Sequence, residues 1–404
     1  MEAPLNRLVP KDSYDVVVVG GGPAGSIAAK TCAEAGLTVL LAEKRPDLGV
    51  PNRCAEGIPR EQMEQFVKPK DSWIASVVNA GYAISPGGYV AGQVFENAGY
   101  VLERKVFDRD LFAAAGEAGA DIFPKTEAVE LIMDGEAASA VRFTLRDRNV
   151  KAVKTLAVIG ADGVESVIGK SAGLTTAIPP KETHSCAQYL MTGVELERDD
   201  CLYFYVGRDI APGGYAWAFP KGGGLYNVGL GVCPDSAGGR NAFGCLNAFV
   251  GERFPGAKAV EIHMGLVPAS GSLKRFTRGN VALVGDAARH SDPFSGAGLI
   301  HAMYSGKMAA ESVVSAVTDG GDIVESFVEN YKKPWEKGIG KKLKQFYKVR
   351  NMFLDITDGE LDTIIRRLGE VVGEKRIGVS DIIPTLLKVL MSTPSLIPKT
   401  RHLL

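Results

Sequence analysis

The sequence lacks the features that would tie a chain to a membrane interior, a secretory route or a nucleic acid. No apolar run approaches the ~20 residues of a spanning helix. Residues 1–10 contain Glu2 and Arg7 and lack the apolar centre of a signal peptide. The formal net charge of the 404 residues is −1, which provides no general attraction to nucleic acid. We therefore expect a cytoplasmic protein, with a peripheral position at the inner face of the cell membrane left open.

Metal-ligand spacing is also missing. The six cysteines form no C-x-x-C pair, and the five histidines are scattered along the chain. We therefore predict no metal site, and in a reducing compartment we expect most of the cysteines to be buried as small apolar residues. Cys54 is the exception, because it lies in a glycine- and proline-bounded loop at 49–57 together with Arg53 and Glu56. The composition of this loop fits a segment that faces a reactive centre and fits a surface turn equally well.

The segment Tyr14–Gly25 contains the strongest local signal in the chain. The run Val16–Val19 predicts a strand buried on both faces, and a helix is predicted from Pro23 to Ala35. Between and within them stand glycines at G-x-G-x-x-G spacing: Gly20, Gly22 and Gly25. A strand, a glycine turn and a helix N-terminus in this order favour a dinucleotide pyrophosphate over a ligand-free turn.

The end of the second predicted strand, 38–42, indicates which dinucleotide. Glu43 follows Gly25 by 18 residues, so its carboxylate can accept hydrogen bonds from both hydroxyls of an adenosine ribose. The same charge would repel a 2′-phosphate, despite Lys44 and Arg45 beside it. The pattern favours FAD or NAD over NADP; a solvated strand end is the weaker interpretation.

Two further strands run into glycine turns downstream. A hairpin is predicted over 139–159, and its second strand leads into Gly160–Gly163. A short strand at 281–284 leads into Gly285–Ala288, and Gly296–Gly298 then opens an apolar helix to about Val317. Between these, 101–112 begins as a strand and continues as a helix, with Arg104 near the junction.

The region 183–270 predicts an antiparallel sheet. Strands are expected at 203–206, 215–220 and 225–232, with a turn at 221–224. Period-two alternation places Tyr215, Trp217 and Phe219 on one face. On the pattern alone, an ordinary sheet core is favoured over a ligand-binding aromatic wall.

Gly320–Gly321 marks a boundary, and helices are expected at about 323–333, 337–355, 359–371 and 379–391. From Lys332 to Arg350 there are eight basic residues and one acidic residue, Glu336. We slightly prefer a solvated face to an acidic partner or anionic lipid. The tail 377–404, with its apolar stretch 382–391, is suited either to a bilayer surface or to packing on the protein.

The motifs GGGPAG (20–25), GADG (160–163) and GDAA (285–288), in this order, resemble the FAD-containing fold of p-hydroxybenzoate hydroxylase and its relatives. More narrowly, the chain resembles archaeal geranylgeranyl reductases, also called digeranylgeranylglycerophospholipid reductases. That resemblance rests on four stretches: EKRPDLGVPNRCAEG (43–57), GYVLERKVFDRDL (99–111), YAWAFPKGGGLYNVGLG (215–231) and GDAARHSDPFSGAG (285–298).

The resemblance implies an α/β (α+β) fold in three parts. A Rossmann-like FAD-binding domain with a parallel sheet would comprise 1–60, 99–180 and 272–320. An antiparallel-sheet substrate domain would comprise 61–98 and 181–271, and a C-terminal helical domain would comprise 321–404.

The resemblance also implies residue roles. FAD would be held by Gly20, Gly22, Pro23, Ala24, Gly25, Glu43, Lys44, Arg53, Cys54, Ala55, Arg104, Ala161, Asp162, Gly163, Gly285, Asp286, Gly296, Ala297 and Gly298. The isoprenoid chain would contact Tyr215, Trp217, Phe219 and Pro293. Cys54 and Glu56 would be the catalytic candidates, with water as a further proton source.

The implied reaction is FAD-dependent reduction of isolated C=C bonds in geranylgeranyl chains of archaeal membrane lipids, such as 2,3-di-O-geranylgeranylglyceryl phosphate, to saturated phytanyl chains. Reduced flavin N5 would supply the hydride. The electron donor would be reduced ferredoxin or NAD(P)H. Three alternatives stay open: a flavin monooxygenase of an aromatic or isoprenoid substrate, a chlorophyll-pathway geranylgeranyl reductase, and a non-enzymatic flavin module.

Overall fold

The computed structural model describes residues 9–374, 382–393, 396, 398 and 399. The chain forms two compact units. Unit 1 contains 1–50, 105–177 and 270–344, and unit 2 contains 51–104, 178–269 and 345–404. The three-domain division stays a prediction. Among the described residues of its helical part, 321–404, those up to 344 belong to unit 1 and those from 345 onward belong to unit 2.

Unit 1 is built on a parallel sheet, as predicted. β1 (Ser13–Val19) pairs with β2 (Val39–Glu43) on one side and β9 (Val150–Gly160) on the other. Further out, β6 (Asp121–Pro124) pairs with β2, and β16 (Val281–Leu283) pairs with β9. Val16, Val17 and Val18 are completely buried, as a strand covered on both faces requires.

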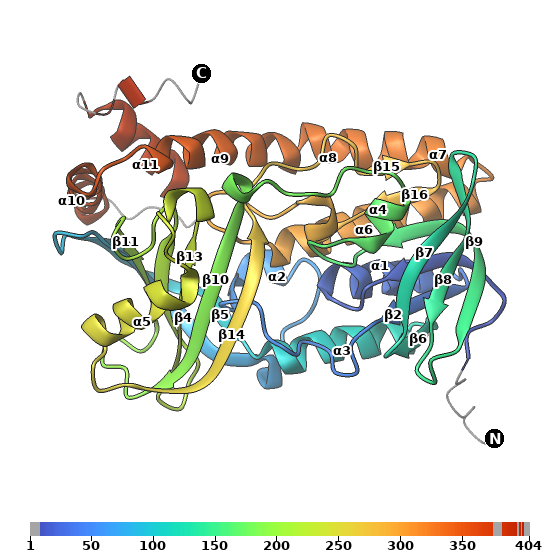
Figure 1. Ribbon diagram of the computed structural model, residues 1–404, viewed down its shortest axis with the longest axis horizontal. Coiled ribbons are helices and arrows are strands. Elements are labelled where there is room, and N and C mark those ends of the chain that lie inside the picture. Colours follow the sequence, from blue (N-terminus) through green and yellow to red (C-terminus); the bar gives the residue numbers. More distant parts are fainter. Residues whose placement is uncertain (1–8, 375–381, 394–395, 397, 400–404) are drawn as a thin grey trace. The chain divides into compact units, whose positions relative to one another are not determined.

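Short antiparallel strands complete this sheet. β15 (Thr277–Arg278) pairs with β16, and β7 (Glu127–Asp134) pairs with β8 (Ala137–Thr144). β8 also pairs with β9 around the turn at 145–149, which confirms the hairpin predicted over 139–159 (Figure 1).

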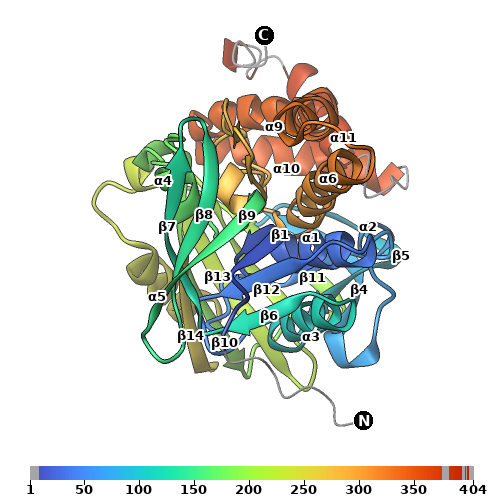
Figure 2. The same cartoon turned by 90° about the vertical axis from the view of Figure 1, so that its right-hand side faces the viewer.

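Two helices of unit 1 lie side by side, α1 (Pro23–Glu34) and α6 (Leu299–Thr318) (Figure 2). Small residues make this approach possible: a Cβ on Gly306 would lie 2.2 Å from the carbonyl oxygen of Ala24. α3 (Arg104–Glu117) begins two residues after β5 ends, as predicted from the sequence around Arg104. α4 (Val167–Ser171) follows β9.

Unit 2 is built on an eight-stranded sheet in the order β14-β10-β13-β12-β11-β4-β5-β3. Its strands are β3 (Gly57–Pro59), β4 (Ile74–Ile84), β5 (Val90–Leu102), β10 (Thr183–Thr192), β11 (Cys201–Val206), β12 (Tyr215–Pro220), β13 (Leu225–Val232) and β14 (Lys258–Pro268). All pairs are antiparallel except β11 with β4. Figure 1 shows β10 and β14 running together along their length. The strands predicted at 215–220 and 225–232 are confirmed.

The faces of this sheet differ. α5 (Ala242–Arg253) covers one face, where Ala216 and Ala218 pack among buried apolar residues. Trp217 and Phe219 belong to a separate cluster, with Tyr215 packed against it. The predicted alternation along β12 is therefore confirmed.

The chain ends in helices α7 (Ile323–Ser326), α8 (Lys333–Lys337), α9 (Ile339–Leu354), α10 (Asp358–Glu374) and α11 (Ile382–Met391), with a π-helical turn at Phe327–Lys332. In unit 2, Asp362 of α10 accepts hydrogen bonds from the Ser85 hydroxyl and the Gly87 N–H. The predicted tail segment 377–404 lies partly outside the described residues.

Candidate functional site

The glycine turn after β1 is held by close backbone contacts within unit 1. Gly20 has φ +105, and a Cβ on it would lie 2.3 Å from the carbonyl oxygen of Ala161. A Cβ on Gly25 would lie 1.9 Å from the carbonyl oxygen of Gly20. Both glycines are therefore required by the fold itself, and they bring the first and second predicted motifs together.

Gly22 differs from its two neighbours in the motif. Its φ of −71 and ψ of −178 suit any residue, and a Cβ there would meet no protein atom within 4 Å. It is the N-cap of α1, has no side-chain cap, and is followed by Pro23. The first N–H groups of a helix have no intrahelical partner and attract anions. A bare backbone facing open space at this position fits the pyrophosphate of FAD.

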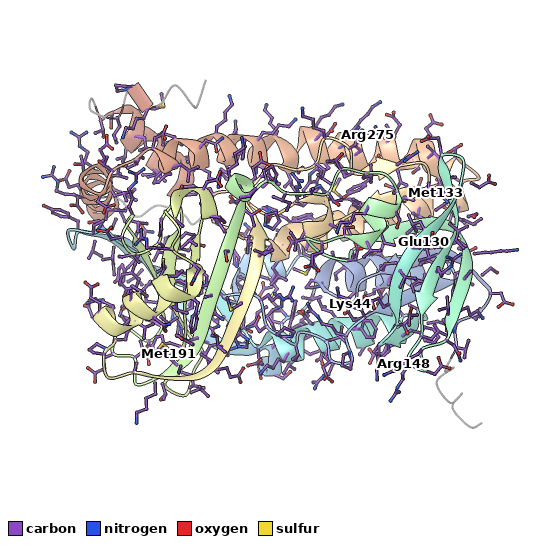
Figure 3. All side chains as sticks on the ribbon, in the orientation of Figure 1. Lys44, Glu130, Met133, Arg148, Met191 and Arg275 are labelled. Carbon is purple, nitrogen blue, oxygen red and sulfur yellow. The ribbon has the colours of Figure 1, made fainter. Side chains whose placement is uncertain are left out.

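Glu43 ends β2 beside this turn. Its Oε2 accepts a hydrogen bond from the N–H of Gly21 at 2.8 Å, and its Oε1 accepts one from the N–H of Arg45 at 2.9 Å. Glu43 therefore ties the strand end to the glycine turn. Carboxylate oxygens have further lone pairs, so these bonds leave capacity for ribose hydroxyls. Lys44 follows as an exposed side chain (Figure 3).

The third motif lies against the first. Gly285 has φ +57, and its Cβ position lies 3.3 Å from the Ala24 methyl carbon. Its N–H donates to the hydroxyl of the buried Ser305 on α6 at 2.9 Å. A Cβ on Gly298, the N-cap of α6, would lie 3.5 Å from Asp286 Oδ1. The start of α6 and the Asp286 carboxylate are thus neighbours.

The loop before α6 is internally bonded. Asp292 donates its N–H to the Ala297 carbonyl and accepts the N–H of Gly296 at its own carbonyl, both at 2.8 Å. Pro293 is buried and Ala297 is exposed. Gly296, with φ +74, adopts a left-handed conformation that glycine permits.

Asp162 has a structural task in addition to its predicted place near FAD. Its Oδ1 accepts a bond from the Ser166 hydroxyl at 2.7 Å, and its Oδ2 accepts the N–H of Ile168 at 2.9 Å. Burial raises the pKa of Asp162, and these two donors act in the opposite direction. Its carboxylate thus anchors the start of α4. Gly163, with φ +79, leaves open space at its Cβ position.

In unit 2, the Cys54 loop is clamped by buried polar side chains. The N–H of Cys54 donates to Asn52 Oδ1 at 3.1 Å, and the N–H of Glu56 donates to Cys54 Sγ at 3.2 Å. Glu56 has φ +74, a left-handed conformation that is rare and costly for a residue other than glycine. Cys54 and Ala55 are half-buried, and Arg53 is exposed.

The Glu56 side chain is 1% exposed and surrounded by donors. Its Oε2 pairs with Lys221 Nζ at 2.8 Å and accepts Asn227 Nδ2 at 2.7 Å. Its Oε1 accepts the N–H of Arg104 at 2.9 Å. Asn227 also donates to the Ala55 carbonyl at 3.3 Å. Both carboxylate oxygens of Glu56 therefore accept hydrogen bonds from the protein, and the side chain is fixed between β13, Lys221 and the start of α3.

The three aromatic residues of β12 form a continuous wall with Phe204. Ring centroids are 5.9 Å apart between Tyr215 and Trp217, 5.8 Å between Phe204 and Tyr215, and 5.3 Å between Phe204 and Phe219. These edge-on and tilted arrangements are favourable for aromatic pairs. Within the wall, Trp217 and Phe219 are 8% and 6% exposed, and Tyr215 and Phe204 are half-buried.

Sequence reasoning missed the residues that connect the wall to the Cys54 loop, namely Gln188, Lys221, Asn227 and Gly229. The indole Nε1–H of Trp217 donates to Gln188 Oε1 at 2.8 Å, and Gln188 Nε2 donates to the Cys54 carbonyl at 3.3 Å. Part of the signal was present in the sequence: Asn227, Gly229 and Gly231 alternate along β13 on the face of the aromatic wall.

The predicted site residues therefore fall into two groups. Unit 1 brings together the residues of the three glycine motifs with Glu43 and Gly298. Unit 2 brings together Cys54, Ala55 and Glu56, the Arg104 backbone and the aromatic wall. Arg53 lies along Gly265, whose Cβ position is 3.4 Å from Arg53 Cβ.

Comparisons with known proteins agree with this geometry. The model of an FAD binding domain matches residues 13–199, and the model of the geranylgeranyl reductase catalytic domain matches 182–267. A digeranylgeranylglycerophospholipid reductase from Methanosarcina mazei is 42% identical over 384 residues, covering 94% of each chain. Its counterpart from Methanothrix thermoacetophila is 39% identical over 393 residues, covering 96% of this chain and 99% of its own.

Solved structures share the fold of this chain. A geranylgeranyl bacteriochlorophyll reductase-like protein from Thermoplasma acidophilum superimposes with a TM-score of 0.89 at 30% identity, covering 97% of this chain and all of its own. A p-nitrophenol 4-monooxygenase from Pseudomonas putida, with a TM-score of 0.70 and 17% identity, covers 94% of this chain and 98% of its own and shares the fold alone. This protein therefore belongs to the family of digeranylgeranylglycerophospholipid reductases.

Proposed function

We propose that this protein is an FAD-dependent reductase that saturates isolated C=C bonds in geranylgeranyl chains of archaeal membrane lipids. The observation that carries the proposal is the aromatic wall of β12, which lies within the region that matches the geranylgeranyl reductase catalytic domain and is linked to the Cys54 loop by the hydrogen bonds of Gln188. A polyisoprenoid chain offers no hydrogen bonds, so its site must consist of apolar and aromatic surface.

The residues of unit 1 would hold FAD. Gly22 and the N-terminus of α1 would receive the pyrophosphate, and Glu43 would accept bonds from the adenosine ribose. Asp286 would bind a ribityl hydroxyl, and the backbone of Gly296–Gly298 would face the flavin ring. When bound and reduced, FAD supplies the hydride equivalent that an alkene cannot obtain from any amino-acid side chain.

The residues of unit 2 would hold the substrate chain. Tyr215, Trp217 and Phe219 would contact the isoprenoid units, and Pro293 of unit 1 is proposed as a further contact. Because an isolated alkene has no carbonyl to spread negative charge, hydride and proton must arrive together in a fixed geometry. The apolar wall would provide this fixed geometry and exclude water.

Cys54 is our proposed proton source. The carboxylate oxygens of Glu56 already accept bonds from Lys221, Asn227 and the Arg104 N–H, so we assign Glu56 the task of holding the loop. The Cys54 thiol carries an S–H, and the Glu56 N–H at 3.2 Å stabilises the sulfur as the proton leaves. Water then restores the proton between turnovers.

The electron donor is a separate proposal. Lys341, Lys342 and Lys344 are exposed on α9 within the basic segment and would suit an acidic ferredoxin. Reversing these three charges should slow flavin reduction by ferredoxin and leave reduction by dithionite unchanged. Equal slowing with both reductants, or no slowing, would remove the docking proposal. NAD(P)H is the other donor to be tested in the same assay.

Contact with a membrane is proposed as peripheral. Within the part of the chain that the structure describes, no helix combines the length and apolarity needed to cross a bilayer. A lipid substrate nevertheless requires access to a bilayer surface. Flotation with vesicles of anionic archaeal lipid, compared at low and high salt, tests this proposal.

The decisive experiment is anaerobic. The protein is reduced with dithionite, digeranylgeranylglyceryl phospholipid is added, and lipid mass is followed for stepwise gains of one hydrogen pair. Product formed without oxygen excludes the monooxygenase, and free geranylgeranyl diphosphate assayed in parallel tests the chlorophyll-pathway alternative. Reduced protein that is never reoxidised by any alkene would refute the proposal and leave the non-enzymatic flavin module.

A further inference from the structure

A buried line of side-chain hydrogen bonds joins the aromatic wall to the backbone of the Cys54 loop. Trp217 donates its indole N–H to Gln188 Oε1 at 2.8 Å, and Gln188 donates from Nε2 to the Cys54 carbonyl at 3.3 Å. Gln188 is 4% exposed and Trp217 is 8% exposed. A buried amide that satisfies an acceptor at one end and a donor at the other fixes the separation of its two partners.

The register of the sheet explains how Trp217 reaches Gln188. Both residues are paired with Gly229 of β13, from opposite sides. A Cβ on Gly229 would lie 2.6 Å from Trp217 Cζ2 and 2.8 Å from the carbonyl oxygen of Ala187. The indole therefore crosses over β13 at the point where that strand has no side chain.

The other end of the loop is anchored independently. Ala55 and Glu56 are held by Asn227, and Glu56 is also held by Lys221. Those bonds do not involve the Cys54 carbonyl or the aromatic wall. Of the bonds described here, only those of Gln188 make the backbone position of Cys54 depend on an aromatic residue that lines the wall.

We propose that Gln188 is a positioning residue that sets the place of Cys54 relative to the Trp217 indole, and thereby couples contact of an apolar chain with the wall to the geometry of the Cys54 thiol. The coupling to substrate rests on the proposed function. The role of Gln188 in placing Cys54 does not depend on the proposed function, because it concerns contacts within the protein alone.

The first test is the alkylation rate of Cys54 by iodoacetamide in the FAD-loaded, full-length protein. Trypsin releases residues 54–60 as a peptide with Cys54 as its only cysteine, so mass spectrometry follows this thiol alone. Gln188→Met keeps the size of the side chain and removes both bonds. In this variant the Cys54 loop can open without breaking the bond between Gln188 and the Cys54 carbonyl. Because opening then costs less free energy, the alkylation rate should rise about tenfold.

Tyr189→Phe is the matched control. Tyr189 is the next residue on β10, points to the opposite face, and donates one hydrogen bond to Asn247 Oδ1 at 2.8 Å. Removing the Tyr189 hydroxyl costs the protein one exposed side-chain hydrogen bond from the same strand without touching the Cys54 loop. We expect a Cys54 alkylation rate within twofold of wild type.

Trp217→Phe provides a second variant in case Gln188→Met folds poorly. It keeps an aromatic ring but removes the N–H donor together with part of the buried indole, so Cys54 alkylation should rise several-fold. Because Trp217 acts on Cys54 through Gln188, Cys54 in the variant that combines Gln188→Met with Trp217→Phe should be alkylated no faster than in Gln188→Met alone. Additive increases, or wild-type rates in either single variant, would overturn the positioning role.

The second test is steady-state reduction of lipid. Gln188→Met should lower kcat about tenfold and change KM for the lipid less than twofold, because the apolar wall stays intact while Cys54 is misplaced. Faster alkylation without any lipid reduction, even in wild type, would refute the proposed function and leave the positioning role standing. Normal alkylation with intact lipid reduction would refute the positioning role alone.

Discussion

Substituting Gly22 tests whether this glycine is needed for binding FAD or for the stability of the fold. Alanine fits the observed φ of −71, and its methyl group would meet no protein atom within 4 Å. Alanine is a poorer N-cap than glycine, which destabilises the folded protein, whereas it lowers the entropy of the unfolded chain, which stabilises it. Each effect is below about 1 kcal/mol. Gly22→Ala should therefore leave the unfolding free energy of the apoprotein within about 1 kcal/mol of wild type.

FAD binding should respond differently. The new methyl group would stand where the pyrophosphate has to approach the backbone, and a tenfold loss of affinity corresponds to about 1.4 kcal/mol. At an FAD concentration of about 100 times the wild-type Kd, the ligand stabilises wild type by about 2.7 kcal/mol. In Gly22→Ala the same concentration should add only about 1.4 kcal/mol.

Urea unfolding of apoprotein with and without FAD measures both quantities, and titration of FAD fluorescence gives the Kd directly. Gly25→Ala is the contrasting variant: its Cβ would lie 1.9 Å from the Gly20 carbonyl oxygen, so the apoprotein itself should lose about 3 kcal/mol. Wild-type FAD affinity in Gly22→Ala would refute the placement of the pyrophosphate at this turn.

Three further changes test unit 2. Gly229→Ala should displace the Trp217 indole, seen as altered tryptophan fluorescence and as lipid KM raised more than tenfold; an unchanged spectrum would contradict the close packing. Lys221→Met should destabilise the protein by about 3–5 kcal/mol in urea unfolding, because the Glu56 carboxylate stays buried without its cation, and adding Glu56→Gln should restore part of this loss. Burial and the nearby Arg350 lower the pKa of His184 from 6.5 to about 4, so the unfolded chain binds the extra proton first as the pH falls. Stability should therefore drop by about 2 kcal/mol between pH 7 and pH 5, and His184→Gln should lack this part of the pH dependence in urea unfolding.

Local patterns predicted the part of the fold that local chemistry determines. The β-branched run before Gly20 and the alternation at 215–220 each produced the expected strand, because burial on two faces or one face selects those sequences directly. The role of Gly20 and Gly25 as backbone contacts was not readable, since the sequence does not show that Ala161 lies against them.

The long hairpin of β4 and β5 and the edge strand β14 were not singled out by pattern. Along β14, exposed apolar residues alternate with smaller or polar ones, so the hydrophobic face points to solvent: Val260, Ile262, Met264 and Leu266 are each at least 50% exposed. A rule that places apolar faces inward cannot assign such a strand. Only its pairing with β10 over ten residue positions defines it.

In the candidate site, contacts between individual side chains could not be predicted from the sequence either. Gln188 and Cys54 are 134 residues apart in sequence, and Asn227 and Glu56 are 171 apart, so no spacing rule links them. The motif at 215–231 nevertheless contains a related signal, in the small residues that pair with its aromatic residues. Along β13, Asn227, Gly229 and Gly231 face the rings of Phe219, Trp217 and Tyr215 in register. A glycine in a strand interior costs stability, and here Gly229 provides the space that the Trp217 indole occupies, whereas a Cβ on Gly231 would lie 3.1 Å from Cys186 Sγ. Trp217 and Gly229 are therefore one structural feature, in which the indole lies over β13 and reaches Gln188, the residue that holds Cys54.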